Sequence, residues 1–189
     1  MSRSRLLELV KKKRRHAGFF HWPERRVGEQ HIVQLFSEAA HSAGEHGLTE
    51  IASTVIDPPD CEALGPSGER VGIEVTELVD QKLAGQRPIK IRPKFWDVSE
   101  VVARINHIVR RKDLKCAHVT DFSKLILLVH TDEMFLRGYP GDEILEGLRA
   151  ETFDAPNHFD EVVFMVSYDA RVRTYPWVRL ALSQRTTGQ

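Results

Sequence analysis

The chain has 189 residues with 27 basic and 27 acidic side chains, so its formal net charge is zero and the overall balance gives no sign of nucleic-acid binding. Its length suits one domain with a sizeable core, and its two cysteines, Cys61 and Cys116, exclude a disulfide framework and fit a reducing cytoplasm. No apolar run reaches the length of a membrane span and no signal-peptide core follows Met1, so we expect a cytoplasmic protein without a membrane partner.

The first 27 residues are strongly basic. They hold nine lysines and arginines against two acids, Glu8 and Glu24. We therefore divide the chain into a basic N-terminal arm, residues 1–27, and a single domain, residues 28–189. The arm is either an element that contacts phosphate groups or a solvated tail that keeps the protein in solution.

A helix is predicted from about Gly28 to Glu45. Its apolar residues recur at helical spacing and form one stripe, made of Ile32, Val33, Phe36, Ala39, Ala40 and Ala43. Glu29 lies three residues before Ile32 and therefore falls on this stripe. It is either an acid favoured by the helix dipole in the first turn, or a third acid that joins the two described next in a metal site.

A strand is predicted over residues 50–56, and a hairpin follows it. The turn, Gly65-Pro66-Ser67-Gly68, is rich in residues that reverse a chain. Asp60 lies seven residues before Ser67 and Glu74 seven after it, so the two acids face each other across the strands. Because like charges are destabilising at such a distance, a divalent cation held by both carboxylates would relieve the repulsion. The alternative is an exposed hairpin with two solvated acids, or a slipped register.

The second strand of the hairpin, residues 71–79, is rich in β-branched residues. Its side chains alternate, so Glu74 and Thr76 share one face, and Ile73 and Val75 share the other. A charge on an otherwise apolar strand needs a partner or a metal ion if it is buried.

Pro59-Asp60, a short loop and then Glu74-Val75-Thr76 resemble the motif of the PD-(D/E)XK nuclease superfamily, which has the restriction-endonuclease-like fold. The resemblance rests on about 20 residues of motif and on a compatible order of elements over residues 28–166. It implies that Asp60 and Glu74 bind magnesium, and that a glutamate of the first helix, here Glu29, can join them. The superfamily has a lysine two residues after the glutamate, which positions or activates water, and this chain has Thr76 there.

Lysines elsewhere in the sequence are candidates for the charge missing at Thr76. Residues 81–94 form a basic, proline-containing connection in which Lys90 and Lys94 lie. This connection is either a loop that contacts a phosphate backbone or an ordinary surface loop.

Lys112 is the first choice among these lysines. A second helix begins at Asp97, which with Glu100 makes a start like a capping box. The apolar stripe of this helix consists of Val98, Val101, Val102, Ile105, Ile108 and Val109. Lys112 continues the stripe, so its side chain can run along apolar surface and deliver an ammonium group at its end. It is either such a migrated lysine, which the resembled superfamily is known to contain, or a lysine favoured at a helix C-terminus.

The remaining elements complete an α/β pattern. Leu125–Val129 and Val162–Val166 are continuously apolar and predict two buried central strands. A helix of about ten residues is predicted around Leu145, and an edge strand over Tyr175–Leu182. The order α, β, β, β, α, β, α, β predicts an α/β (α+β) sandwich with a central mixed sheet flanked by helices, in agreement with the restriction-endonuclease-like core that the resemblance implies.

The leading hypothesis is a nuclease that uses Mg²⁺ or Mn²⁺ to hydrolyse phosphodiester bonds of nucleic acid, with DNA as the expected substrate. Asp60, Glu74 and Glu29 are the expected metal ligands, and Thr76 and Lys112 complete the expected catalytic group. The alternative is a catalytically inactive nuclease-like module that binds nucleic acid or a protein partner, for which Thr76 is the main argument. A third hypothesis is a small structural or immunity-type protein whose acids bind a partner's basic groups. A homodimer would suit cleavage of two strands.

Overall fold

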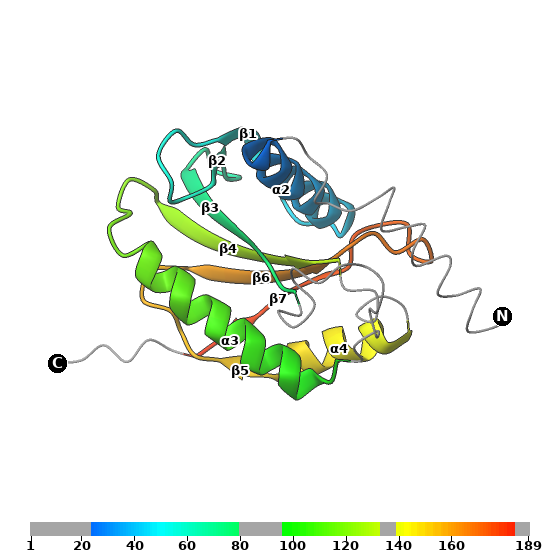
Figure 1. The fold of residues 1–189 in the computed structure, drawn as a ribbon. Helices are drawn as coiled ribbons and strands as arrows, with labels where there is room; N and C mark the ends of the chain where they lie inside the picture. The colour runs from blue at the N-terminus through cyan, green and yellow to red at the C-terminus, as the bar shows by residue number, and fades with distance from the viewer. Residues whose placement is uncertain (1–23, 80–95, 133–138, 184–189) are drawn as a thin grey trace.

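The computed structural model describes residues 24–79, 96–132 and 139–183 (Figure 1). The helices of these residues are α2 (Arg25–Ser42), α3 (Val98–Lys115) and α4 (Tyr139–Ala150). The strands are β1 (Thr49–Ser53), β2 (Cys61–Leu64), β3 (Arg70–Glu77), β4 (Lys124–Thr131), β5 (Thr152–Phe153), β6 (Glu161–Val166), β7 (Trp177–Arg179) and β8 (Ala181–Leu182). The first 23 residues of the predicted arm, and the basic connection with Lys90 and Lys94, lie outside the described residues.

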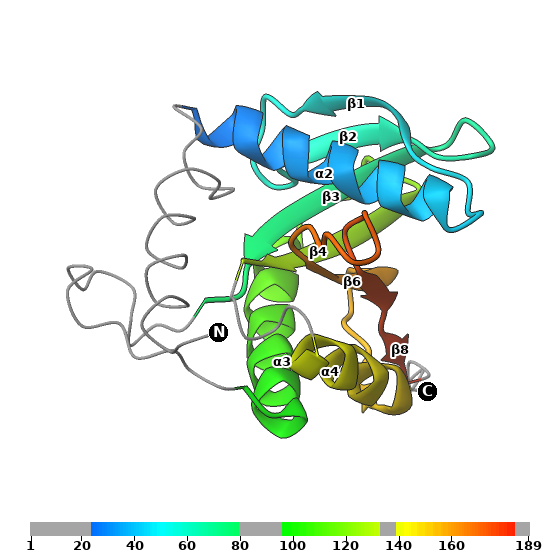
Figure 2. The same ribbon diagram turned by 90° about the vertical axis from the view of Figure 1, so that its right-hand side faces the viewer.

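Six strands form one mixed sheet, in the order β1-β2-β3-β4-β6-β7. β1, β2 and β3 are antiparallel, β3, β4 and β6 run parallel, and β7 is antiparallel to β6. α2 covers one face of this sheet, and α3 and α4 cover the other (Figure 1, Figure 2). The fold is therefore α/β, with a central mixed sheet between helices, as the sequence predicts.

The two central parallel strands contribute to a core on each face of the sheet. On β4, Leu125, Leu127 and Val129 pack on the side of α3 and α4, whereas Ile126 and Leu128 pack on the side of α2. β6 alternates in the same way. A strand buried on both faces has a continuous apolar sequence rather than an alternating one. Both predicted central strands are thus confirmed.

α2 begins three residues earlier than predicted, after Glu24, which has the extended backbone of an N-cap residue. Arg25 and Arg26 therefore belong to the helix and not to the arm predicted over residues 1–27. Glu29 consequently lies in the second turn of α2, not in the first. The buried face of α2 includes Ile32, Val33, Phe36, Ala39 and Ala40, as the spacing predicts. Ala43, the last residue of the predicted stripe, is exposed, because α2 ends at Ser42 and not at Glu45.

α3 begins after Asp97, as predicted. A side-chain oxygen of Asp97 accepts a hydrogen bond from the backbone N–H of Glu100 at 2.8 Å, which caps the helix. The buried residues of α3 are Val101, Ile105, Ile108, Val109, Lys112 and Asp113. The carboxylate of Asp113 accepts the backbone N–H groups of Asn157 and His158, and so ties the end of α3 to the chain that enters β6. Lys112 continues the buried stripe, as the sequence predicts.

Two predicted strands differ from the observed ones by more than two residues at an end. β1 ends at Ser53 because Thr54 turns back onto the following loop: its N–H donates to the carbonyl of Asp60 at 3.1 Å, and its hydroxyl donates to the carbonyl of Pro59. The edge strand predicted over Tyr175–Leu182 is divided between two sheets. β7 pairs with β6, whereas β8 leaves the main sheet and pairs in parallel with β5.

Candidate functional site

The hairpin of β2 and β3 has the predicted register. Cys61 pairs with Ile73 and Leu64 with Arg70, so the hairpin is centred on Ser67. Gly68 has a φ of 82°, a backbone conformation that glycine adopts without strain and that closes the turn. Continued by one residue, this register sets Asp60 opposite Glu74.

Glu74 lies in the middle of β3, and its side chain is completely buried. Since Ile73 and Val75 belong to the core beneath α2, Glu74 points to the opposite face, toward α3. Its Oε1 accepts hydrogen bonds from Lys112 Nζ at 2.6 Å and from Lys115 Nζ at 3.1 Å. Its Oε2 is also buried, and no hydrogen-bond partner for it exists among the described residues. Burial of a charged group without full hydrogen bonding is costly, so this oxygen is a candidate ligand atom.

Asp60 directly precedes β2 and is buried. Its Oδ2 accepts the backbone N–H of Val75 at 2.8 Å, which ties the loop before β2 to β3. Its Oδ1 lies 3.3 Å from Nη2 of Arg25. Burial, together with the negative charge of Glu74, raises the pKa of Asp60 to about 7. Near neutral pH, the carboxyl group of Asp60 is therefore protonated in part of the protein molecules. A cation that binds there has to displace this proton.

Asp57 is a third acid of this group, and the sequence patterns above did not single it out. One carboxylate oxygen from each of Asp57, Asp60 and Glu74 lies within 4.8 Å of the other two; these three residues are the acidic cluster. A hydrogen bond from Lys115 Nζ, at 2.6 Å, lowers the pKa of Asp57. The available signal was the sequence Asp57-Pro58-Pro59-Asp60, because two stiff prolines limit how the connecting loop can be arranged.

Two lysines reach the acidic cluster from the last turn of α3. Lys112 is 8% exposed, and its Nζ donates to Oε1 of Glu74 and, at 3.3 Å, to the carbonyl of Val75. The structure thus brings Lys112 to Glu74, where the sequence predicts it. Lys115, which was not predicted, donates to both Glu74 and Asp57. Lys115 follows Lys112 by three residues, so the two lie at neighbouring positions of the helix surface. This spacing is the sequence feature from which Lys115 could have been predicted.

Glu29 is not part of the acidic cluster, contrary to the prediction that it joins the metal ligands. Its Oε1 accepts a hydrogen bond from Nε of Arg25 at 2.6 Å, one helical turn away. Arg25 also contacts Asp60, so its guanidinium bridges Glu29 and Asp60. Because α2 begins at Arg25, the charge that this helix brings into contact with Asp60 is positive.

Thr76 lies two residues after Glu74 on the same face of β3 and is half-buried. It pairs in register with Val129 of β4. A hydroxyl group carries no positive charge at neutral pH, so Lys112 and Lys115 are the cations that contact the acidic cluster from this side of the sheet.

Comparison of the chain with known protein families, with curated proteins and with solved structures finds no match. Among residues 24–79, 96–132 and 139–183, no helix combines the length and the apolar character that a bilayer span requires.

The charges around the acidic cluster are closely matched. When all groups are ionised, Asp57, Asp60 and Glu74 carry three negative charges, and Lys112, Lys115 and Arg25 supply three positive ones, of which Arg25 is shared with Glu29. Oε2 of Glu74 stays without a hydrogen-bond partner among the described residues, and hard carboxylate oxygens are the ligands preferred by Mg²⁺ and Mn²⁺.

The raised pKa of Asp60 predicts a pH-dependent stability in metal-free buffer. Its ordinary pKa of 3.8 rises to about 7 in the folded protein, so between these values the folded state binds more protons than the unfolded state. The free energy of unfolding should therefore fall as pH rises from about 4 to 7. Asp60→Asn keeps an oxygen for the N–H of Val75 and should remove this fall. Denaturant unfolding at pH 5 and pH 8 measures it.

Asp57→Asn serves as the contrast for that experiment. Because its pKa is lowered, Asp57 contributes stability that is present at neutral pH and lost on acidification. Its replacement should therefore lower stability at pH 8 more than at acidic pH, the opposite of the Asp60 variant. If both variants had the same pH dependence, the assignment of the raised pKa to Asp60 would be wrong.

Proposed function

We propose that the chain is a metal-dependent nuclease that hydrolyses phosphodiester bonds of nucleic acid, with DNA as the expected substrate. The observation that carries the proposal is the contact of 2.6 Å between Lys112 Nζ and Oε1 of Glu74, beside Asp60. The resembled superfamily needs a lysine next to these two acids. Here α3 supplies that lysine in place of the residue at Thr76.

The order of elements supports the same proposal. A helix, three antiparallel strands, a second helix and a strand parallel to β3 follow one another as α2, β1, β2, β3, α3 and β4. This is the core expected of a restriction-endonuclease-like fold, and we propose that the sandwich is of this type. Fold alone does not establish activity, so the proposal depends on the acidic cluster and its lysines.

The residues of the acidic cluster fit a divalent ion. The donors are hard carboxylate oxygens, and Oε2 of Glu74 is buried without a partner in the described part of the chain. Asp57, Asp60 and Glu74 are therefore the proposed ligands of Mg²⁺ or Mn²⁺. When bound, such an ion lowers the pKa of a coordinated water and stabilises negative charge on the leaving oxygen.

The two lysines have different parts in this proposal. Lys112 is buried and uses two of its three N–H bonds, toward Glu74 and Val75, so its third can hold a water molecule or a phosphate oxygen beside Glu74. Lys115 has a side chain that is 38% exposed and lies between Asp57 and Glu74. Its long flexible side chain can move away when another cation binds there, and in the metal-free protein it reduces the repulsion between these acids.

Metal-dependent stabilisation is the first test. Mg²⁺ or Mn²⁺ at about 100 times its dissociation constant should raise the free energy of unfolding by about 2.7 kcal/mol, which is readily measured as a higher melting temperature. The same ions should support cleavage of single-stranded or double-stranded DNA. Glu146→Gln, which removes an exposed acid of α4 outside the acidic cluster, is the matched control and should keep both effects.

The outcomes separate the candidate functions. Stabilisation together with cleavage supports the nuclease. Stabilisation without cleavage of any nucleic acid tested would leave the inactive binding module. Absence of stabilisation by either ion would remove the metal site, and with it the proposed chemistry.

A further inference from the structure

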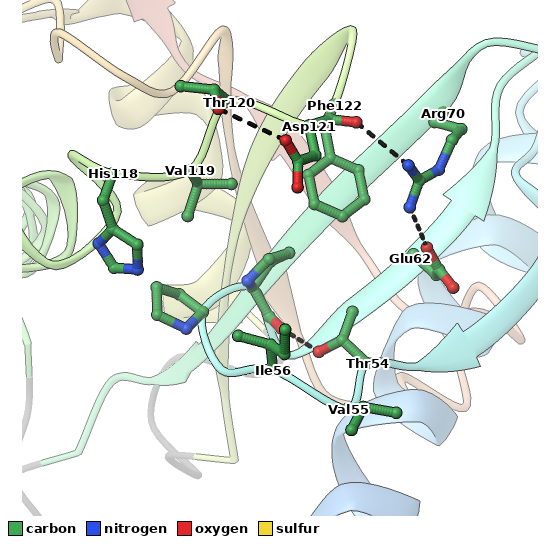
Figure 3. A pocket seen from close by; sticks show the side chains of 12 residues that line it. Thr54, Val55, Ile56, Glu62, Arg70, His118, Val119, Thr120, Asp121 and Phe122 are labelled. Atoms are coloured by element: carbon green, nitrogen blue, oxygen red, sulfur yellow. Dashed lines mark hydrogen bonds and ion pairs between the residues drawn. The ribbon is translucent and has the colours of Figure 1, made fainter.

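A pocket of about 300 Å³ opens on the surface of the protein (Figure 3). It is formed by the loop after β1, by the β2–β3 hairpin and by the loop between α3 and β4. Figure 3 shows Phe122 and Arg70 on one side of it, and Val55 and Ile56 below them. A volume of this size is at the lower end of ligand pockets and suits one heterocycle rather than a base pair.

The pocket and the acidic cluster share one loop. Pro58 and Pro59 line the pocket, and the residues on either side of them, Asp57 and Asp60, belong to the acidic cluster. A ligand in the pocket and a group bound at the acidic cluster would therefore contact the same short stretch of chain.

The ring of Phe122 provides a second link between the pocket and the acidic cluster. It packs directly over Gly72, where a Cβ atom would come within 3.0 Å of the ring. Gly72 and Glu74 occupy the same face of β3, about 7 Å apart along the strand. The ring of Phe122 therefore lies over the residue two positions before Glu74 on the same face of β3. A base in the pocket can reach that far from its own sugar while its phosphate lies at Glu74.

The rim of the pocket is apolar and open to solvent. Val55 is 85% exposed and Ile56 is 76% exposed. Single exposed aliphatic residues are common, but these two are adjacent and lie at the mouth of a pocket. A ligand that covers them removes apolar surface from water and is bound more tightly for it.

Phe122 is held in place before any ligand arrives. The guanidinium of Arg70 lies 4.9 Å from the centre of the ring. Arg70 is itself held by a hydrogen bond of 2.8 Å to Glu62 and one of 3.3 Å to the carbonyl of Asp121. A positioned aromatic side chain that lines an open pocket is an apolar wall of the kind against which proteins hold unpaired bases.

The charges of the pocket favour a base over a phosphate group. Glu62 and Asp121 contribute carboxylates, and Arg70 is already paired with Glu62. Carboxylates repel phosphate oxygens, whereas they accept hydrogen bonds from the N–H groups of a base.

We propose that this pocket, named here the Phe122 pocket, receives one unpaired nucleobase next to the phosphodiester bond that the acidic cluster cleaves. The inference rests on the proposed nuclease function and adds a substrate class to it. The substrate is a nucleic-acid strand with an unpaired base at the cleavage position, because a base that remains paired in a duplex cannot enter a pocket of this size.

Binding of free nucleosides tests the Phe122 pocket without any cleavage. Deoxyadenosine, deoxycytidine, deoxyguanosine and thymidine are titrated into the full-length metal-free protein, and backbone amide signals are followed by NMR. We expect saturable shifts at Val119–Phe122 and at Thr54–Ile56.

Phe122→Leu, which keeps an apolar side chain in the core, should weaken binding by about tenfold. Ile56→Ser, at an exposed position, should weaken it in the same direction, and Leu114→Ala, at an exposed position outside the pocket, should not.

Oligonucleotides with one abasic position link the pocket to cleavage. With Ca²⁺ replacing Mg²⁺, removal of one particular base from a single-stranded oligonucleotide should lower its affinity for the wild-type protein by about tenfold, and should have no effect on the affinity for the Phe122→Leu variant.

Cleavage with no sensitivity to any abasic position would overturn the pocket and leave the nuclease standing. Saturable nucleoside binding without cleavage by Mg²⁺ or Mn²⁺ would support the pocket and overturn the nuclease. Absence of nucleoside shifts up to the solubility limit would overturn the pocket.

Discussion

Replacement of Lys112 by alanine is expected to lower nucleic-acid cleavage by on the order of 100-fold or more, as the loss of a positioned charge-stabilising group does. The ammonium group of Lys112 lies 2.6 Å from Glu74 and is held there by the buried stripe of α3. Metal affinity should barely fall, because Lys112 is not among the proposed ligands. Single-turnover cleavage at saturating Mg²⁺, with thermal shifts for the ion, measures the two quantities separately.

The same substitution also has a cost in stability, which the cleavage assay has to take into account. Removing one partner of a buried ion pair costs about 3–5 kcal/mol. The cost here should be near the lower end, because Lys115 still contacts Oε1 of Glu74. Cleavage is therefore compared at a temperature where the variant is folded, as checked by circular dichroism. Lys124→Ala breaks a less buried ion pair with Glu161, away from the acidic cluster, and is the matched control.

The double variant Lys112→Ala, Thr76→Lys tests whether a lysine at position 76 restores cleavage. Position 76 shares the face of Glu74, so a lysine there restores a cation where the resembled superfamily has one. Partial recovery of cleavage is the expected result. If the folded Lys112→Ala protein cleaves as fast as the wild type, Lys112 has no part in the chemistry.

Glu74→Gln should abolish divalent-metal binding and also destabilise the metal-free protein. The substitution removes the charge of a proposed ligand, so the rise in melting temperature with Mg²⁺ or Mn²⁺ should vanish. It also leaves the ammonium groups of Lys112 and Lys115 without their shared carboxylate. Since Lys112 is buried, the loss of stability should be on the order of 3 kcal/mol. Denaturant unfolding in chelator measures it.

Asp60→Asn is the sharpest comparison for Glu74→Gln. Both replace one carboxylate of the acidic cluster by an amide, but Asp60 contacts no lysine in the described residues; its contacts are Val75 and Arg25. It should lose metal binding equally and yet be at least as stable as the wild type at pH 8, where its carboxyl group is ionised at a cost. Equal destabilisation by both variants would contradict the pairing of Glu74 with the lysines.

The hairpin and the long helices were predictable because their signals are local. The turn at Gly65–Gly68 determines which residues of β2 and β3 are opposite, so the approach of Asp60 to Glu74 follows from counting residues. The stripe of α3 has the helical period, so the inward direction of Lys112 also follows from the sequence. Neither inference requires any knowledge of how distant elements pack.

Asp57, Lys115 and Arg25 show where sequence patterns stop being sufficient. The contact of Lys115 with Asp57 spans 58 residues and joins a helix to a loop without regular structure, so no periodicity reports it. Arg25 looked like part of the basic arm because α2 starts earlier than its apolar stripe does. Glu29 was placed correctly on a helix near the acids, but its own neighbour Arg25 pairs with it.

The assignment of acids to a hairpin and of lysines to a helix has a consequence for the newly made chain. Asp60 and Glu74 leave the ribosome as one short unit, whereas Lys112 follows Glu74 by 38 residues. Domains fold largely after their parts have been synthesised, and contacts of long sequence separation form late. A nascent or partly unfolded chain thus carries the acids without the lysine, so any cleaving activity would be confined to molecules in which α3 has packed onto the sheet. Proper folding would then itself act as the safeguard against damage to nucleic acid during synthesis.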